Sequence, residues 1–173
     1  MGLIRDSNEF LFIHSIFLSK IMPNPIECFL LVGIPAAGKT TYAKKLSTIT
    51  GSVVLSTDKI REKLYGSENI QGNWLEIEKE LHKLIKHYTR LGIKVIVDAT
   101  HTKPEHRKPL LKLSSHIKWS CYWLDADLKE CLERNNQRSR IVPTSIIKTM
   151  HKQLKLTPPT KAEGFENIYQ MEV

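Results

Sequence analysis

The sequence predicts an α/β fold of three layers, in which a mainly parallel sheet of five strands lies between helices. Short apolar runs alternate with longer amphipathic segments, as they do where helices connect parallel strands. The first apolar run leads into a glycine-rich turn and then into a helical pattern. A length of 173 residues, with 41% hydrophobic and 25% charged residues, suits a single globular domain.

The first apolar run, Phe29 to Val32, is the predicted first strand, and the motif G-x-x-x-x-G-K-T follows it directly. Its glycines allow backbone N–H groups to turn inward and cradle phosphate oxygens at the start of a helix, as in P-loop NTPases. In such a loop Lys39 reaches the β- and γ-phosphates of ATP, and the Thr40 hydroxyl ligates Mg²⁺. A turn that binds nothing is the weaker alternative, because the full motif after a strand is specific. The predicted ATP-binding residues of the loop are Gly33, Ile34, Pro35, Ala36, Ala37, Gly38, Lys39, Thr40 and Thr41.

Helix and strand patterns alternate after this loop. Residues 39–48 have a helical pattern, and the β-branched run at 52–56 is the predicted second strand. Residues 58–65 form a short helix that ends at Gly66. Apolar residues at steps of three and four from 74 to 91 indicate the clearest amphipathic helix of the chain.

The second half of the chain repeats this alternation. A buried run at 95–98 is the third strand, and Thr102 to Glu105 has the T-x-x-E pattern of a capping box. Because a proline lies in its first turn, this helix is expected to start at Thr102 and to reach about residue 114. The remaining predicted elements are a strand over 117–124, helices over 127–135 and from 142 to about 154, and a last strand over 167–173.

Two parts of the chain are expected: an extension at residues 1–24 and a P-loop domain at 25–173, which includes a lid around 134–142. The apolar run of the extension is shorter than the roughly 20 residues that a membrane span needs, so no membrane partner is expected. Three cysteines without paired or metal-type spacing favour a reduced, cytoplasmic protein. A net charge of +8 favours polyanionic ligands, although a merely basic surface explains it equally well.

Carboxylates follow the second and third strands, at the edge where parallel sheets bind ligands. Asp58 is the candidate general base, which would take the proton of a hydroxyl that displaces ADP from the γ-phosphoryl group. Its alternative role is to cap the following helix, which Ser56 or Thr57 could do as well. Arg61, one helical turn later, could hold a phosphate of the acceptor or be solvated. Asp98 is a candidate for the metal shell or for a substrate hydroxyl.

Three arginines, Arg134, Arg138 and Arg140, lie between two predicted helices, where a mobile lid would sit. Arg134 and Arg138 are four residues apart and would share a face. There they could close on the triphosphate and neutralise the charge that develops in transfer. The spacing does not indicate which side of the lid Arg140 occupies. The alternative for all three arginines is a basic turn that faces solvent. Arg138 joins Asp58 and Lys39 as a candidate catalytic residue.

At these residues the chain resembles the kinase domain of polynucleotide kinases and, more broadly, the small P-loop kinases grouped with them. The resemblance covers about residues 28–170, and it implies that Asp58 is the general base and that Arg61 binds a phosphate of the acceptor. It also implies that Asp98 supports the acceptor site and that Arg134 and Arg138 hold the donor phosphates. The matching segments are 33–40, 56–61, 97–100 with 105–107, 134–138 and 142–143.

We therefore expect an ATP- and Mg²⁺-dependent kinase that moves the γ-phosphate to a hydroxyl, with the 5′-hydroxyl of a polynucleotide as the leading acceptor. One alternative is a kinase for a small molecule or a nucleotide-type metabolite on the same fold. Transfer to a metabolite but not to oligonucleotides would favour it. Another is an ATP-gated nucleic-acid-binding module without phosphotransfer, in which Asp58→Asn would leave ATP turnover and binding unchanged.

Overall fold

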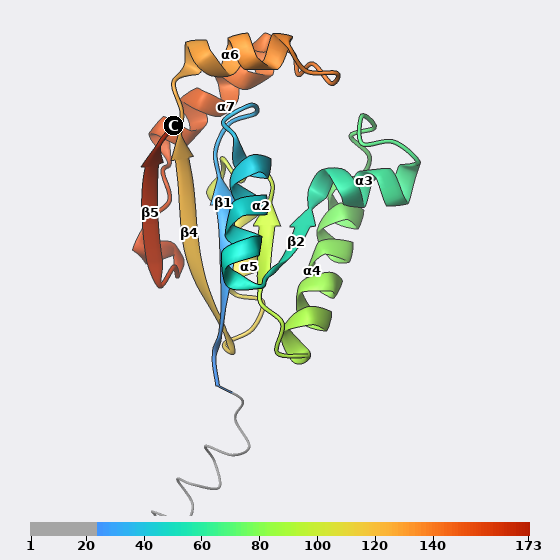
Figure 1. Ribbon diagram of the computed structural model, residues 1–173, viewed down its shortest axis with the longest axis vertical. Helices are drawn as coiled ribbons and strands as arrows, with labels where there is room; N and C mark the ends of the chain where they lie inside the picture. The colour runs from blue at the N-terminus through green and yellow to red at the C-terminus, as the bar shows by residue number, and fades with distance from the viewer. Residues whose placement is uncertain (1–23) are drawn as a thin grey trace, which may run out of the picture.

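A computed structural model describes residues 24–173 of the chain (Figure 1). The expected extension at residues 1–24 lies almost wholly outside the described residues. Five strands form one sheet in the order β2-β3-β1-β4-β5, and every neighbouring pair is parallel. The predicted five-stranded, mainly parallel sheet is therefore confirmed. The strands are β1 Ile26–Val32, β2 Val53–Ser56, β3 Val95–Asp98, β4 Ile117–Asp125 and β5 Asn167–Glu172.

The helices also follow the predicted order, with one start that differs. Proline occupies the first position of α5, and the preceding Lys103 is its N-cap, without a side-chain capping bond. The predicted capping box at Thr102 is wrong, because proline prefers the first helical position and thereby shifts the cap by one residue. A capping box instead joins Thr160 to Glu163. The helices are α2 Lys39–Thr50, α3 Thr57–Tyr65, α4 Trp74–Arg90, α5 Pro104–Leu111, α6 Leu128–Asn136 and α7 Thr144–Leu156, with a short 3-10 helix at Lys161–Glu163.

The central strands are buried on both faces, which is why their sequences are almost continuously apolar. Phe29 and Leu31 of β1 pack against α2, together with Ile96 of β3. The alternate residues Leu30 and Val32 belong to a larger core with α4, α5 and α7. Figure 1 shows α2 in front of the sheet and α5 behind it. This arrangement confirms the predicted α/β/α sandwich.

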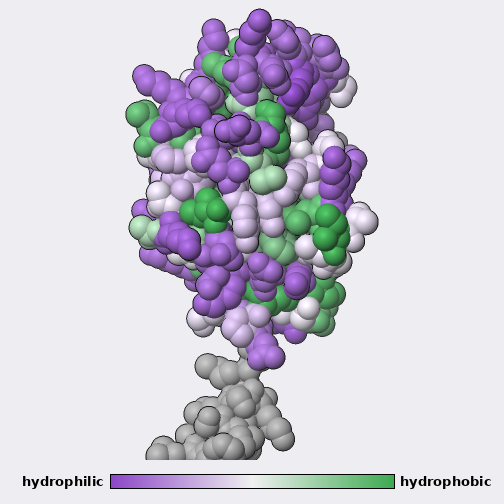
Figure 2. Space-filling view, turned by 60° about the vertical axis from the view of Figure 1, so that its left-hand side comes forward, coloured by the Kyte–Doolittle hydropathy of each residue, from purple (hydrophilic) through white to green (hydrophobic). Residues whose placement is uncertain are grey.

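All strand arrows in Figure 1 point toward the end of the molecule where α6 lies. The loop that follows α6 extends across this end toward α3. The same end, opposite the grey trace in Figure 2, is strongly hydrophilic, and apolar residues on this face form only small separate patches. Within residues 24–173, none of the helices combines the length and apolar character that crossing a membrane requires. The carboxyl edge of the sheet is thus the place to look for a ligand site.

Candidate active site

The loop between β1 and α2 has the backbone of a phosphate cradle. Ala36 and Gly38 adopt left-handed conformations, with φ of 63° and 89°. A Cβ at Gly33 would lie 3.0 Å from the carbonyl oxygen of Leu124, so glycine allows the loop to lie against β4. Gly38 caps α2 without a side-chain hydrogen bond, which leaves the first N–H groups of that helix for another acceptor. A phosphate group fits this position.

Lys39 lies folded under this loop. Its Nζ donates a hydrogen bond to the Ile34 carbonyl oxygen at 2.8 Å, and the residue is buried. Burial lowers the pKa of Lys39 from its usual 10.5 to about 8, and the charge of Asp98 opposes this shift. A bound triphosphate would add much more negative charge beside the amine. We therefore expect ATP to raise the pKa of Lys39 again.

Proton uptake on ATP binding tests this expectation. Between pH 8 and 10.5 the unfolded chain holds a proton at Lys39 that the folded chain has largely lost. The free-energy cost that burial of this amine adds to folding therefore decreases as the pH rises through this range. Binding of ATP should then take up a proton, with the uptake rising toward about 0.9 proton per ATP at pH 9. Calorimetry in buffers of different ionisation enthalpy measures the uptake. Lys39→Arg should remove its rise with pH, and uptake that does not change between pH 7 and 9 in the natural chain would contradict the account.

Thr40 and Asp98 form an oxygen pair beside the loop. Thr40 Oγ1 donates to Asp98 Oδ2 at 2.8 Å, and the aspartate is buried at the end of β3. Burial raises the pKa of Asp98, while the Thr40 hydrogen bond and Lys39 oppose that rise. Within residues 24–173 there is no cluster of three or more His, Cys, Asp or Glu side chains that could hold a metal by itself. The pair fits Mg²⁺, which commonly takes only one or two protein ligands beside waters and phosphate oxygens.

Asp58 and Arg61 lie on the first turns of α3, at the carboxyl end of β2. Ser56 Oγ accepts a hydrogen bond from the Asp58 amide at 3.3 Å, so Ser56 caps this helix and the Asp58 carboxylate does not. Arg61 Nη1 donates to Asp58 Oδ1 at 2.7 Å. The negative charge of Asp58 also contributes to the raised pKa of Asp98. Ser56 pairs in register with Asp98, so the two aspartates lie at the carboxyl ends of neighbouring strands.

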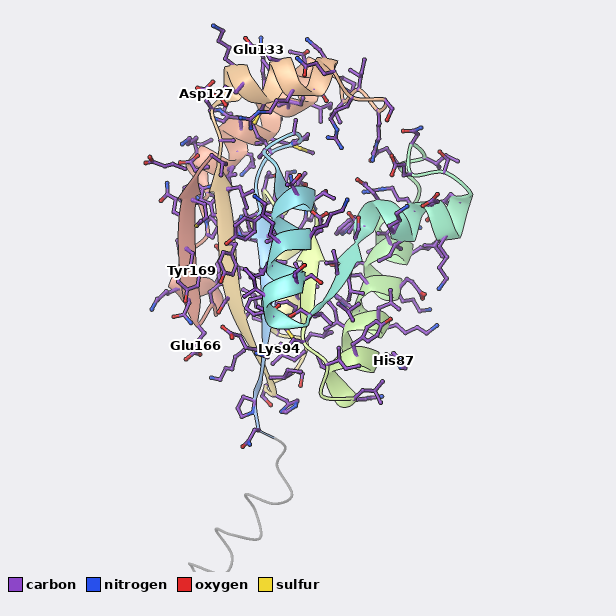
Figure 3. The ribbon with its side chains drawn as sticks, viewed as in Figure 1. His87, Lys94, Asp127, Glu133, Glu166 and Tyr169 are labelled. Carbon is purple, nitrogen blue, oxygen red and sulfur yellow. The ribbon has the colours of Figure 1, made fainter. Side chains whose placement is uncertain are left out.

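The three arginines of the predicted lid lie in different places. Arg134 donates to Glu130 on its own helix at 2.6 Å, and both side chains are about half exposed. The structure thus turns Arg134 toward solvent rather than toward the loop, in this state of the molecule. Figure 3 shows two acidic residues of the same region, Asp127 at the start of α6 and Glu133 on the side of α6 away from the sheet.

Arg138 and Arg140 lie on the loop after α6. Arg138 is exposed, and its positive charge contributes to lowering the pKa of Lys39 and opposes the rise in the pKa of Asp98. Arg140 makes a direct contact, with its Nη1 atom 2.9 Å from Asp58 Oδ1. Spacing alone did not predict this contact, because the residues of a loop have no periodicity that indicates where their side chains lie. The available sequence signal was the carboxylate of Asp58, which follows β2 and could attract a cation.

Arg107 belongs to one of the matching segments, but no role for it was predicted from the sequence. The side chain of Arg107 is fully buried and donates to both carboxylate oxygens of Glu163 at 2.7 Å and to the His101 carbonyl oxygen at 3.0 Å. Its Nη2 also donates to the Thr157 carbonyl oxygen at 3.0 Å. His101 is buried, and burial lowers its pKa to about 3, so it is neutral at physiological pH. Arg107 thereby holds the turn after β3 and the C-terminal segment together.

The profile of the family described as "AAA domain" matches residues 29–157. The chain is 29% identical over 144 residues to an L-seryl-tRNA(Sec) kinase of Methanococcus maripaludis, which covers 76% of this chain and 53% of that protein. The chain therefore spans about half the length of that curated relative.

Solved structures share the fold at low sequence identity. A chain of the Pnkp1/Rnl/Hen1 RNA repair complex superposes with a TM-score of 0.70 at 21% identity, over 78% of this chain and 46% of that one. A gluconokinase from Sinorhizobium meliloti 1021 gives a TM-score of 0.59 at 14% identity, over 87% and 85% of the two chains. A sugar kinase from Janibacter sp. HTCC2649 gives 0.63 at 17% identity, over 84% and 86%. These similarities concern the fold.

Proposed function

The chain belongs to the AAA domain family, with the fold of P-loop kinases, and from this premise we propose that it transfers the γ-phosphate of ATP to a hydroxyl group. The observation that supports transfer, rather than nucleotide binding alone, is the position of Asp58. This carboxylate follows β2, whose last residue Ser56 pairs with Asp98 of β3, and Asp98 accepts a hydrogen bond from Thr40 at the start of α2 at 2.8 Å. Phosphoryl transfer needs a proton acceptor at that place.

The loop and its neighbours would hold the donor. The N–H groups at the start of α2 and the Lys39 amine would bind the phosphates of ATP. Thr40 and Asp98 would hold Mg²⁺ through oxygen atoms, and the ion would neutralise charge on the phosphates. Arg138, from the proposed lid at 134–142, would add positive charge as transfer proceeds, and Arg134 would join it if the lid closes further.

Asp58 would act on the acceptor. As the hydroxyl oxygen bonds to the γ-phosphorus, its proton passes to the Asp58 carboxylate. The bond from the γ-phosphorus to the bridging oxygen breaks, and ADP leaves with that electron pair. The site thus joins a donor half, built on the loop and β3, to an acceptor half, built on α3.

The 5′-hydroxyl of a polynucleotide is the acceptor that we favour. The net charge of +8 and the arginines at the acceptor half suit a substrate with several phosphates. The fold shared with a chain of an RNA repair complex and the similarity to a kinase acting on a tRNA also support it. A small-molecule kinase is the second candidate, since the two sugar kinases match nearly whole chain to whole chain in fold.

An acceptor panel tests this proposal. Purified protein with Mg²⁺ and γ-labelled ATP is offered 5′-hydroxyl DNA and RNA oligonucleotides, nucleosides, sugars and sugar phosphates. We expect label on the oligonucleotides. Label on a sugar or metabolite alone would favour the second candidate, and ATP binding with no labelled acceptor would contradict phosphotransfer.

A further inference from the structure

His101 is a buried histidine with an unusual backbone, in the turn that follows β3. Its φ of 43° lies in the left-handed region, which few residues other than glycine adopt, although histidine, asparagine and aspartate do so more often than most. The residue is only 2% exposed. Backbone strain of this kind persists only where the surrounding structure enforces it, and it is frequent at functional sites.

The two ring nitrogens of His101 have different surroundings. Nδ1 lies 3.3 Å from the Leu31 carbonyl oxygen. A carbonyl oxygen only accepts, so Nδ1 carries the ring proton and donates to this oxygen. Nε2 is then the unprotonated nitrogen, and it is buried without a hydrogen-bond partner among residues 24–173. Because burial lowers the pKa of His101 to about 3, the ring is neutral at physiological pH and carries no proton to give to a substrate.

The bond to Leu31 joins the turn after β3 to the start of the phosphate loop. Leu31 is two residues before Gly33, the first residue of the loop motif, and the Gly33 amide donates to the Thr100 carbonyl oxygen at 3.0 Å. The paired register of β1 and β3 ends at Leu30. Thr100 and His101 therefore continue the connection between the two segments beyond the last strand pair.

The other side of the same turn is also held. Arg107 Nη1 donates to the His101 carbonyl oxygen at 3.0 Å. Arg107 is held in turn by Glu163 at 2.7 Å and by the carbonyl oxygen of Thr157, the C-cap of α7, at 3.0 Å. His101 thus bridges two parts of the chain, since its ring binds β1 and its carbonyl oxygen is fixed to the C-terminal segment.

We propose that His101 is a positioning residue for the donor half of the site, which keeps the phosphate loop in the shape that binds the triphosphate of ATP. The inference rests on the proposed function, because it concerns the same site. The N–H groups of the loop must converge on the phosphate oxygens, and a displacement of about 1 Å is enough to lower a rate about 10²-fold. A residue that is fixed through both its ring and its carbonyl oxygen prevents such a displacement.

Calorimetric titration of ATP with Mg²⁺ into two variants of His101 tests the proposal. Asparagine and glycine both adopt a positive φ, so neither variant changes the backbone. The asparagine amide can donate from nearly the position of Nδ1, whereas glycine has no side chain. We expect His101→Gly to raise the Kd for ATP by about 10-fold, the effect of losing one ordinary hydrogen bond. His101→Asn should keep the Kd within about threefold, because it keeps a donor.

Ile85→Ala is the matched control for the loss of buried volume. Ile85 is fully buried in the larger core and belongs to α4, which carries no residue of the proposed site. Its truncation leaves a cavity and destabilises the fold. At a temperature where circular dichroism shows every variant folded, Ile85→Ala should keep the Kd of the natural chain for ATP.

Steady-state kinetics give a second readout that a merely structural role would not move. His101→Gly should raise KM for ATP and lower kcat, while KM for the acceptor stays unchanged. The pH profile of kcat for His101→Asn should match that of the natural chain, because the neutral His101 ring supplies no proton. A shifted profile, or a rise in KM for the acceptor alone, would overturn the assignment.

The titration requires no acceptor, so this inference and the proposed function fail separately. Weaker ATP binding by His101→Gly than by the natural chain, His101→Asn and Ile85→Ala would uphold the role of His101 even if the acceptor panel found no phosphorylated product. Equal Kd values for His101→Gly and the natural chain would overturn it. Equal weakening in His101→Gly and Ile85→Ala, or no recovery in His101→Asn, would overturn it as well.

Discussion

Asp58→Asn is expected to lower kcat for phosphoryl transfer by about 10²- to 10⁴-fold, the usual contribution of a general base. The asparagine side chain has nearly the same shape but cannot accept the proton. It also releases Arg61 and Arg140, which now hold the carboxylate at 2.7 and 2.9 Å. KM for a phosphorylated acceptor should therefore not rise, and ATP binding should be unchanged. Single-turnover and steady-state assays on the folded variant measure these values.

Glu62→Gln is the matched control for that variant. Glu62 lies on the same helix, and its exposed side chain pairs with Lys59 at 2.8 Å. This change should leave kcat within about twofold, because surface ion pairs contribute little. If Asp58→Asn kept more than a tenth of the natural kcat, Asp58 would not be the base. If ATP turnover were unchanged and no acceptor were labelled, the ATP-gated binding module would be the better account.

Arg107→Met is expected to lower the free energy of unfolding by about 3–5 kcal/mol, because it leaves the Glu163 carboxylate buried without its partner. The side chains of Arg107 and Glu163 are 0% and 7% exposed. The loss should also loosen the turn at His101, whose carbonyl oxygen accepts from Arg107 at 3.0 Å. Urea denaturation of the folded variant measures the change.

Two further variants separate the buried pair from charge loss in general. Lys118→Met breaks a solvent-exposed pair with Glu166, which lies at 3.2 Å with both side chains about half exposed, and should cost at most about 1 kcal/mol. Arg107→Met combined with Glu163→Leu should be less damaging than the sum of the single changes, since it removes the buried charge entirely. A loss below about 1 kcal/mol for Arg107→Met would show that the pair does not hold this segment.

Local signals predicted the fold well. Apolar runs marked the strands, and apolar residues at steps of three and four marked helices such as α4, where Ile77, Leu81 and Ile85 are fully buried. The misplaced start of α5 had a local cause as well: the preference of proline for the first helical position outweighed the T-x-x-E pattern.

The candidate site was predictable only in part. The motif and the strand ends indicated the loop, Asp58 and Asp98, and the three-residue spacing of Asp58 and Arg61 agrees with their ion pair at 2.7 Å. The contacts of Thr40 with Asp98, of Arg107 with Glu163 and of Arg140 with Asp58 join segments far apart in the chain. No periodicity or spacing encodes such pairs, because the fold alone brings them together.

The central claim is that the loop and Asp58 form one site that moves a phosphoryl group. Phosphorus NMR tests it most directly, with ATP, Mg²⁺ and a 5′-hydroxyl oligonucleotide incubated with the protein. The account predicts a new phosphomonoester signal on the oligonucleotide in equal amount to the ADP formed. ADP accompanied only by inorganic phosphate, or no reaction of bound ATP with that oligonucleotide or any other hydroxyl compound, would contradict it.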